Sequence, residues 1–412
     1  MTSRTPDPEC ATSSQPKLER SITLPWLIFY GVGVTVGAGI FALIGEILAL
    51  AGDKTPLSFL VAGAIAAVTG VSYILLVRRF PKAGGEAVFV NRGLGPLAGR
   101  AVGFGVVVTG TISSAVIALA FGGYLSTLIN VNERLAAVVI VGLLALVAWW
   151  GVKESVVLAG VITLIEIGAL IVVVAYGLPL LRDGAAVANS LNPTPVAGVG
   201  LTPVLAGAVV AFFAFVGFED LENMAEETVD PRRTTPLAIA ATLVITIAVY
   251  VLLGIVAVLA PNREAITESS APLAALWNEL SGFDARPMAA IAAIAMINGI
   301  LVQILMASRV LYGMAGEGLL PSALARVDAS RHTPSAATAV VAVAIAALAA
   351  FFPLVGLAKA TSLITLTVFS LVNLSLFTIG TKLPELGLRR LRWVGLVGAA
   401  LAFSLAVWQL VP

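Results

Sequence analysis

Cysteine, histidine and charged residues are scarce in this chain of 412 residues. The only cysteine is Cys10 and the only histidine is His332, which excludes a disulfide framework, a thiolate metal cage and a Cys/His or Ser/His catalytic arrangement within the spans. Charged residues make up 11%, against roughly 25% in a typical soluble domain, too few to cover a water-soluble fold. A net charge of +1 gives no basic field for nucleic acid. We therefore expect no enzyme, no metal, no cofactor and no nucleic-acid partner.

Apolar residues make up 59% of the chain and form many runs long enough to cross a bilayer. These runs are bounded by charges, proline or glycine and lie at about 24–50, 56–77, 97–128, 135–150, 156–180, 203–225, 236–260, 287–314, 335–352, 355–380 and 392–411. The sequence thus predicts an all-α, polytopic membrane helix bundle with about eleven transmembrane helices. We expect the lipid bilayer to surround most of this bundle.

The basic residues predict how the bundle is oriented. If residues 1–20 form a disordered cytoplasmic tail, roughly three quarters of the 24 lysines and arginines fall on the cytoplasmic side of the alternating loops. This predicts an inner-membrane protein with its N-terminus inside and its C-terminus outside. Residues 21–412 then form a single transmembrane domain.

Two of the predicted spans contain features that interrupt a helix. The first contains GVGVTVGAGIFALIGE, with five glycines, and the sixth contains FFAFVGFEDLE, where Gly217 precedes a group of acids. Non-helical backbone at membrane depth survives only where protein or a wet cavity surrounds it. Interruptions at corresponding places in two halves predict a binding site and a five-plus-five inverted repeat, about 24–180 and 203–380, with 392–411 as an extra helix. A glycine face for close helix packing is the alternative for the first span.

Several sequence blocks resemble those of the amino acid-polyamine-organocation family of secondary transporters. They are GVGVTVGAGIF at 31–41, RRFPKAGGEAVFV at 78–90, GVKES at 151–155, FFAFVGFEDLENMAEETVDPRRTTPLAI at 212–239 and SRVLYGMAGEGLLP at 308–321. The resemblance covers nearly the whole chain and implies a LeuT-type fold, uptake or exchange of amino acids or related amines, and no covalent chemistry. Most family members have twelve helices, so the C-terminal region departs from the pattern.

An amino acid would need partners for both of its charges at the bilayer midplane. The N–H groups of four residues, where the first span resumes its helix, suit the carboxylate: Gly37, Ala38, Gly39 and Ile40. Carbonyl groups freed at the two interruptions suit the ammonium: those of Thr35, Phe213, Ala214 and Val216. The resemblance assigns these roles to the matching positions. We expect the small Ala38 and Val216 to leave room, and Phe212, Phe215 or Phe218 to act as a gate, as a wall or as simple packing.

Glu166 lies near the middle of the fifth predicted span, too deep to reach water. Its helical face includes Thr163 and Ala169, which favours an inward orientation. Many members of the family have lysine at this position, aligned by GVKES, where it replaces a sodium ion between helices 1, 5 and 8. A carboxyl group there could take up and release a proton (H⁺) in each cycle, could help to hold a Na⁺ ion, or could remain a protonated hydrogen-bond donor to carbonyl groups of the first span.

The acidic residues after the second interruption could have more than one role. Asp220 and Glu222 are expected to solvate a cytoplasmic vestibule, whereas Glu219 could select basic substrates or pair with a cation of the cytoplasmic gate. Farther along, Asp230-Pro231 predicts a turn and Pro236 the opening of the next helix.

Together these features predict a secondary active transporter, a symporter or antiporter of amino acids that works by alternating access, with proton coupling as one option. An amine or polyamine transporter of the same fold and a non-transporting membrane sensor are the alternatives.

Overall fold

A computed structural model describes residues 20–81, 85–151, 156–194, 200–316, 318–328, 331 and 333–410, with the side chains of 156–159 and 384 excepted. Nearly all of the predicted tail, Cys10, His332 and residues 152–155 of the GVKES block therefore lie outside the described residues. Within them the fold is helical, and strand-type pairing is limited to an isolated bridge between Ile22 and Thr228.

The long helices match the apolar runs closely. They are α1 (Leu24–Ala51), α2 (Thr55–Val77), α4 (Pro96–Leu128), α5 (Glu133–Trp150), α6 (Val156–Gly177), α8 (Thr202–Phe213), α10 (Pro231–Leu259), α13 (Arg286–Gly316), α14 (Ser335–Phe351), α15 (Leu354–Lys382) and α16 (Arg392–Trp408). Seven described segments are long and apolar enough to span a membrane, and the first of them contains both α1 and α2. Three further apolar helices are shorter: α8, α14 and α16. The chain is a polytopic helical membrane protein. The count of eleven spans and the inverted repeat stay predictions.

Short helices occupy the loops, which the search for spanning runs did not predict. They are α3 (Gly85–Leu94), α7 (Gly184–Ser190), α9 (Asp220–Asn223), α11 (Arg263–Thr267) and α12 (Pro272–Ser281). Local caps help to form them, since the Asp183 side chain accepts a hydrogen bond from the Ala186 N–H at 3.0 Å and the Asn262 side chain accepts one from Ala265 at 3.3 Å. Such caps are local sequence features, and a search for apolar runs does not detect them.

The prediction that Pro236 opens a helix is wrong. The helix α10 begins five residues earlier, at Pro231, and Pro236 lies inside it. Asp230 turns the chain in the left-handed conformation (φ 47°), and Pro231 suits the first helical position because no N–H bond is needed there. The carbonyl group that Pro236 leaves without a helical donor belongs to Arg232, an exposed residue.

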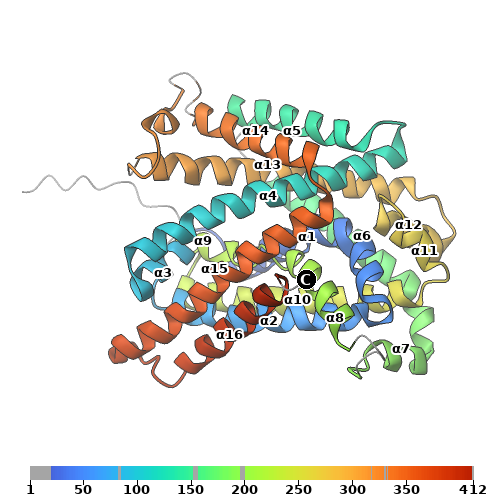
Figure 1. The fold of residues 1–412 in the computed structure, drawn as a ribbon, viewed down its shortest axis with the longest axis horizontal. Coiled ribbons are helices and arrows are strands. Elements are labelled where there is room, and N and C mark those ends of the chain that lie inside the picture. The colour runs from blue at the N-terminus through green and yellow to red at the C-terminus, as the bar shows by residue number, and fades with distance from the viewer. Residues whose placement is uncertain are drawn as a thin grey trace, which may run out of the picture.

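The helices pack in two groups (Figure 1). One group contains α1, α2, α8 and α10, and the other contains α4, α5, α13 and α14, which form the upper layer in the view of Figure 1. Two further helices join the groups, because α6 packs against α1 and α13, and α15 packs against α4 and α8. The last helix, α16, packs on α15 and α2. Both interrupted segments belong to the first group.

Candidate functional site

The interruption predicted in the first span is present at Gly37. Its φ of −37° and ψ of −141° are not helical, although α1 is helical on both sides. Space is open beside it, since no atom of the described residues lies within 4 Å of where a Cβ of Gly37 would stand. Thr35 is 2% exposed, and its hydroxyl group has no hydrogen-bond partner among the described residues. A buried hydroxyl group without a partner is unusual in a folded protein and is the kind of group that a ligand can satisfy.

The second interruption is longer. The helix α8 ends at Phe213 and α9 begins at Asp220. Between them the chain forms tight turns, in which the Val216 N–H donates to the Phe213 carbonyl oxygen at 3.2 Å. Gly217 has a φ of 124°, a backbone conformation that residues other than glycine rarely adopt. The Phe213 carbonyl group, predicted to be free for an ammonium, is therefore already engaged in a turn.

The two interruptions touch each other. A Cβ on Gly39 would lie 2.9 Å from the Cα of Ala214, and one on Gly217 would lie 3.1 Å from the Val34 carbonyl oxygen. Ala38, which is 7% exposed, faces Gly299 of α13, and Ile40 is fully buried. The residues predicted to bind the two ends of a substrate are thus brought together at one place.

Tyr250 of α10 joins the two interruptions, a contact that the sequence did not predict. Its hydroxyl group is 2.9 Å from the Thr35 carbonyl oxygen and 2.8 Å from the Ala214 carbonyl oxygen. A phenol has one proton, so it donates to one of these carbonyl groups at a time. Both carbonyl groups were predicted to accept from a substrate ammonium. In this structure the Tyr250 hydroxyl occupies that role, and a lone tyrosine in an apolar helix gave no signal of it.

The three phenylalanines near the second interruption are buried against other aromatic rings. Phe215 is fully buried and its ring lies edge-on to Tyr250, with 5.1 Å between centroids. Phe212 and Phe218 both pack against Phe369 of α15, at 5.7 and 5.4 Å. The ring contact of Phe215 fits the packing role among the three alternatives given for it. Val216, the next residue, lines a cavity.

Glu166 is buried in α6, with 4% of its surface exposed, while Leu164 and Ile165 beside it are 63% and 43% exposed. The inward orientation expected for Glu166 is therefore confirmed. Among the described residues, none donates a hydrogen bond to its carboxyl group. The helix lies close to α1 at Gly33, where a Cβ would strike Thr163, and Glu166 is near enough to Tyr250 to act on it electrostatically. Glu166 is thus a buried carboxyl group on a helix that packs against α1, the helix that contains the first interruption.

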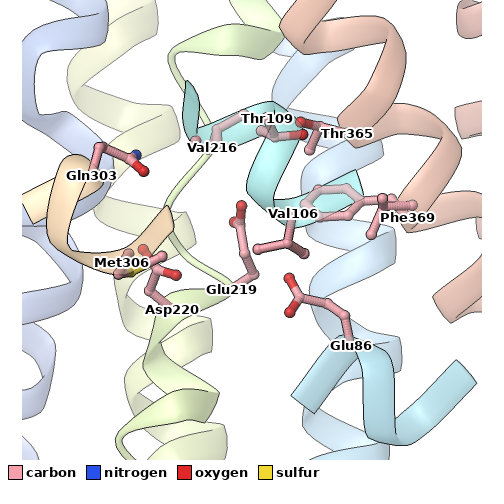
Figure 2. Close-up of a pocket in the computed structure, with 12 residues that line it drawn as sticks. Glu86, Val106, Thr109, Val216, Glu219, Asp220, Gln303, Met306, Thr365 and Phe369 are labelled. Carbon is pink, nitrogen blue, oxygen red and sulfur yellow. The ribbon is translucent and has the colours of Figure 1, made fainter. Parts of the chain in front are cut away.

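A small cavity of about 40 Å³ lies next to Val216 (Figure 2). Three carboxyl groups line it, from Glu219 of the second interruption, Asp220 at the start of α9 and Glu86 of α3. The Thr109 and Thr365 side chains lie on the side away from Glu86. Glu219 accepts a hydrogen bond from the Gly217 N–H at 2.8 Å. Glu86 accepts one from the Tyr73 hydroxyl at 3.3 Å, and burial raises the pKa of the Glu86 carboxyl group. Glu219 and Asp220 therefore line the same cavity as Glu86, and the cytoplasmic vestibule expected of Asp220 stays a prediction.

The helices and the shared interruption define a class of protein, a polytopic membrane protein whose broken helices meet within the bundle. Comparison with known proteins gives the family: the model for amino acid permeases matches residues 22–412. The chain belongs to the amino acid permease family. The resemblance drawn from the sequence blocks is thereby confirmed.

Individual relatives agree with this assignment. An uncharacterized transporter of Mycobacterium tuberculosis is 34% identical over 396 residues, covering 94% of this chain and 87% of the relative. A mitochondrial cationic amino acid transporter of Arabidopsis thaliana is 30% identical over 387 residues, covering 89% of this chain and 63% of the relative. A branched-chain amino acid permease of Bacillus subtilis is 25% identical over 398 residues, covering 91% and 84%. The chain is thus similar to proteins named for different amino acids, and it spans less than two thirds of the plant relative.

Proposed function

We propose that this protein is a secondary active transporter of amino acids that works by alternating access. The observation that carries the proposal is the contact between the two interruptions, with Gly39 against Ala214 and Gly217 against Val34, beside the open space at Gly37. Irregular backbone in a membrane protein marks a site for a polar solute. The names of the relatives, which include both cationic and branched-chain amino acids, support an amino acid as that solute.

The substrate carboxylate binds the N–H groups at positions 37–40, where the second part of α1 begins, because a helix N-terminus favours an anion. The substrate ammonium binds the carbonyl oxygens of Thr35 and Ala214, and displaces or shares the Tyr250 hydroxyl that lies between them. Backbone groups then bind the part that all amino acids share. The Thr35 hydroxyl group gains the partner that it lacks among the described residues.

Proton coupling through Glu166 completes the proposal. A carboxyl group buried in a span without a partner is costly when charged, and it is therefore suited to taking up and releasing a proton. Its proximity to Tyr250 gives a physical route from its charge to both interruptions. A purely structural carboxyl group and a ligand for Na⁺ are the rival roles.

The test is uptake into proteoliposomes with an imposed inward proton gradient. Wild-type protein and a Glu46→Gln control, in which an intramembrane glutamate of α1 is neutralised, should accumulate substrate above equilibrium. Glu166→Gln should retain counterflow exchange but lose this accumulation. Accumulation that survives in Glu166→Gln would contradict proton coupling through this residue, and accumulation driven only by a sodium gradient would indicate the cation-ligand role.

A thermal-shift screen of the purified protein against amino acids and amines identifies the substrate, since a ligand of the folded state raises the melting temperature by mass action. Binding without counterflow would contradict transport and indicate a sensor. We further propose the inner membrane as the location, with the N-terminus inside and the C-terminus outside, which labelling of single cysteines introduced at each end would test.

A further inference from the structure

A groove with a volume of about 610 Å³ opens on the surface of the bundle between α6, α12 and the start of α13. Ala169 of α6 and Met288 of α13 are 6% and 4% exposed and lie at its base, while Val172 at its edge is 41% exposed. Gly168 widens the groove, because no described atom lies within 4 Å of where a Cβ of that glycine would stand. The volume is in the range of roughly 300–1,000 Å³ that pockets for small ligands occupy.

The groove faces the hydrocarbon of the bilayer. It lies along two segments that are long and apolar enough to span a membrane, and the apolar side chains of Leu164, Ile171 and Ile294 beside it are 63%, 58% and 49% exposed. Apart from Asp284 and the indole of Trp277, its lining has no polar side chain, so water would find few hydrogen-bond partners there. Empty space would forfeit the contacts that the walls can make. The lining therefore favours an apolar occupant.

An aromatic cluster stands at one end of the groove. Tyr176 of α6, Trp277 of α12 and Phe283 are in ring contact, with 5.0 Å between the centroids of Tyr176 and Trp277 and 6.1 Å between those of Trp277 and Phe283. The Trp277 indole N–H donates to the Asp284 carbonyl oxygen at 3.2 Å. Tryptophan and tyrosine gather where a span meets the membrane–water interface. The groove therefore begins at the depth of the lipid head groups.

From the aromatic cluster the groove runs inward for about the thickness of one leaflet. Gly168 lies eight positions before Tyr176, which is roughly 12 Å along α6. A hydrocarbon core of roughly 30 Å gives each leaflet roughly 15 Å. An apolar groove of this depth matches the hydrocarbon chain of a lipid whose head group lies beside the aromatic cluster.

Two charges of opposite sign stand at the same end of the groove. Asp284 lines the groove, and Arg286, two positions later, is exposed at the first position of α13. The Asp284 carboxylate accepts a hydrogen bond from the Arg286 N–H at 3.0 Å, and neither side chain takes part in an ion pair among the described residues. A guanidinium suits a phosphate, and a carboxylate suits an ammonium. The pair therefore complements a head group that carries both charges.

We propose that this groove binds an acyl chain of a zwitterionic phospholipid of the bilayer, such as phosphatidylethanolamine, with its phosphate at Arg286 and its ammonium at Asp284. The chain lies against α6 on the side of Gly168 and separates this part of α6 from α13. Because α6 packs against α1 of one helix group and α13 of the other, the lipid occupies a joint between the two groups. This site is independent of the proposed function.

Native mass spectrometry of the purified full-length protein, titrated with palmitoyl-oleoyl phosphatidylethanolamine, tests the site. The wild type should bind a first lipid saturably. Gly168→Leu fills the open space, and its affinity for that lipid should fall by about tenfold, the value of roughly two methylene groups withdrawn from contact. Gly142→Leu is the matched control, since Gly142 of α5 also has open space beside it but does not line the groove, and it should keep the wild-type affinity. Leucine favours a helix more than glycine does, so neither variant should melt below the wild type.

Diacylglycerol with the same two chains tests the head group. It lacks the phosphate and the ammonium, and should bind the wild type about tenfold more weakly than the phospholipid, the value of one hydrogen bond to a charged group. Arg286→Gln should bring the affinity for phosphatidylethanolamine close to that for diacylglycerol. Arg326→Gln, which removes an exposed arginine beyond the other end of α13, should leave the difference unchanged.

Equal affinity of Gly168→Leu and the wild type for phosphatidylethanolamine would overturn the inference, because the lipid would then bind elsewhere. Oleate that binds as tightly as the phospholipid and is weakened by Gly168→Leu would also overturn it, and would identify a free fatty acid as the occupant. A dimer that Gly168→Leu disrupts would overturn it in favour of a second copy of the chain. None of these outcomes bears on substrate uptake, which tests the proposed function separately.

Discussion

The two interruptions differ in the length of chain that is not helical. In α1 the non-helical geometry is confined to Gly37, so its N–H groups are redirected while the side chains around them stay packed. Between α8 and α9 the chain leaves the helix from Ala214 to Glu219, with a positive φ at Gly217, and delivers acids to a cavity. The short interruption is suited to binding what all amino acids share. The long one adds side-chain carboxyl groups beside the contact between the two interruptions.

The largest expected effect is at the long interruption. Gly217→Ala would place a methyl group in a conformation unfavourable for alanine and 3.0 Å from a Val34 side-chain atom. The two costs together are of the order of 3 kcal/mol. The melting temperature in detergent should fall steeply, with loss of binding. A Gly142→Ala control, at a position with open space inside the helix α5, should melt no lower than the wild type. Wild-type stability in Gly217→Ala would show that the interruption is not built as described.

An intermediate effect is expected where Tyr250 joins the two interruptions. Tyr250→Phe leaves the carbonyl groups of Thr35 and Ala214 without this donor, which costs about 1–3 kcal/mol in the ligand-free protein. A saturating amino acid should recover most of the lost melting temperature, because its ammonium supplies the missing donor.

Tyr124→Phe is the matched control, since the Tyr124 hydroxyl donates to the Phe41 carbonyl oxygen at 2.7 Å, a contact that no substrate is proposed to replace. Its deficit in melting temperature should persist with ligand. An equal deficit in Tyr250→Phe with and without substrate would show that the two carbonyl groups do not accept from the ammonium.

The smallest effect on stability is expected at the short interruption. Gly37→Ala adds a methyl group that contacts no described atom within 4 Å, so the melting temperature should stay close to that of the wild type. The methyl group enters the space proposed for the substrate, and affinity should fall by about tenfold, or 1.4 kcal/mol. Gly39→Ala sharpens the contrast, because its methyl group would strike the Ala214 backbone and should lower stability first. Unchanged affinity in Gly37→Ala would place the substrate elsewhere.

The sequence predicted the helices and the positions of both interruptions well, for a physical reason. Long apolar runs and glycine clusters are local features, and the bilayer makes both of them decisive. It placed Glu166 on the inward face from the small neighbours Thr163 and Ala169. These inferences needed no knowledge of which helices are neighbours.

What the sequence could not predict depends on contacts between distant segments. The Tyr250 hydroxyl group is 215 positions from Thr35, and the cavity joins Glu86, Gln303 and Thr365 from three separate elements. Asp220 lines the same cavity as Glu86 of α3, a neighbour far away in the sequence that its own helix end does not reveal. Pairing of this kind becomes visible only when the packing of the helices is known.

Protection of a single cysteine by substrate tests the central claim most directly. In a Cys10→Ser background, Ala38→Cys places the only thiol at the first interruption, facing Gly299 of α13. Its rate of modification by a small thiol reagent is measured with and without a saturating amino acid. We predict that the amino acid slows modification by about tenfold or more, while a cysteine at the exposed Glu268 reacts at an unchanged rate. An amino acid that binds, as shown by thermal shift, but leaves the reaction at position 38 as fast as before would contradict the account.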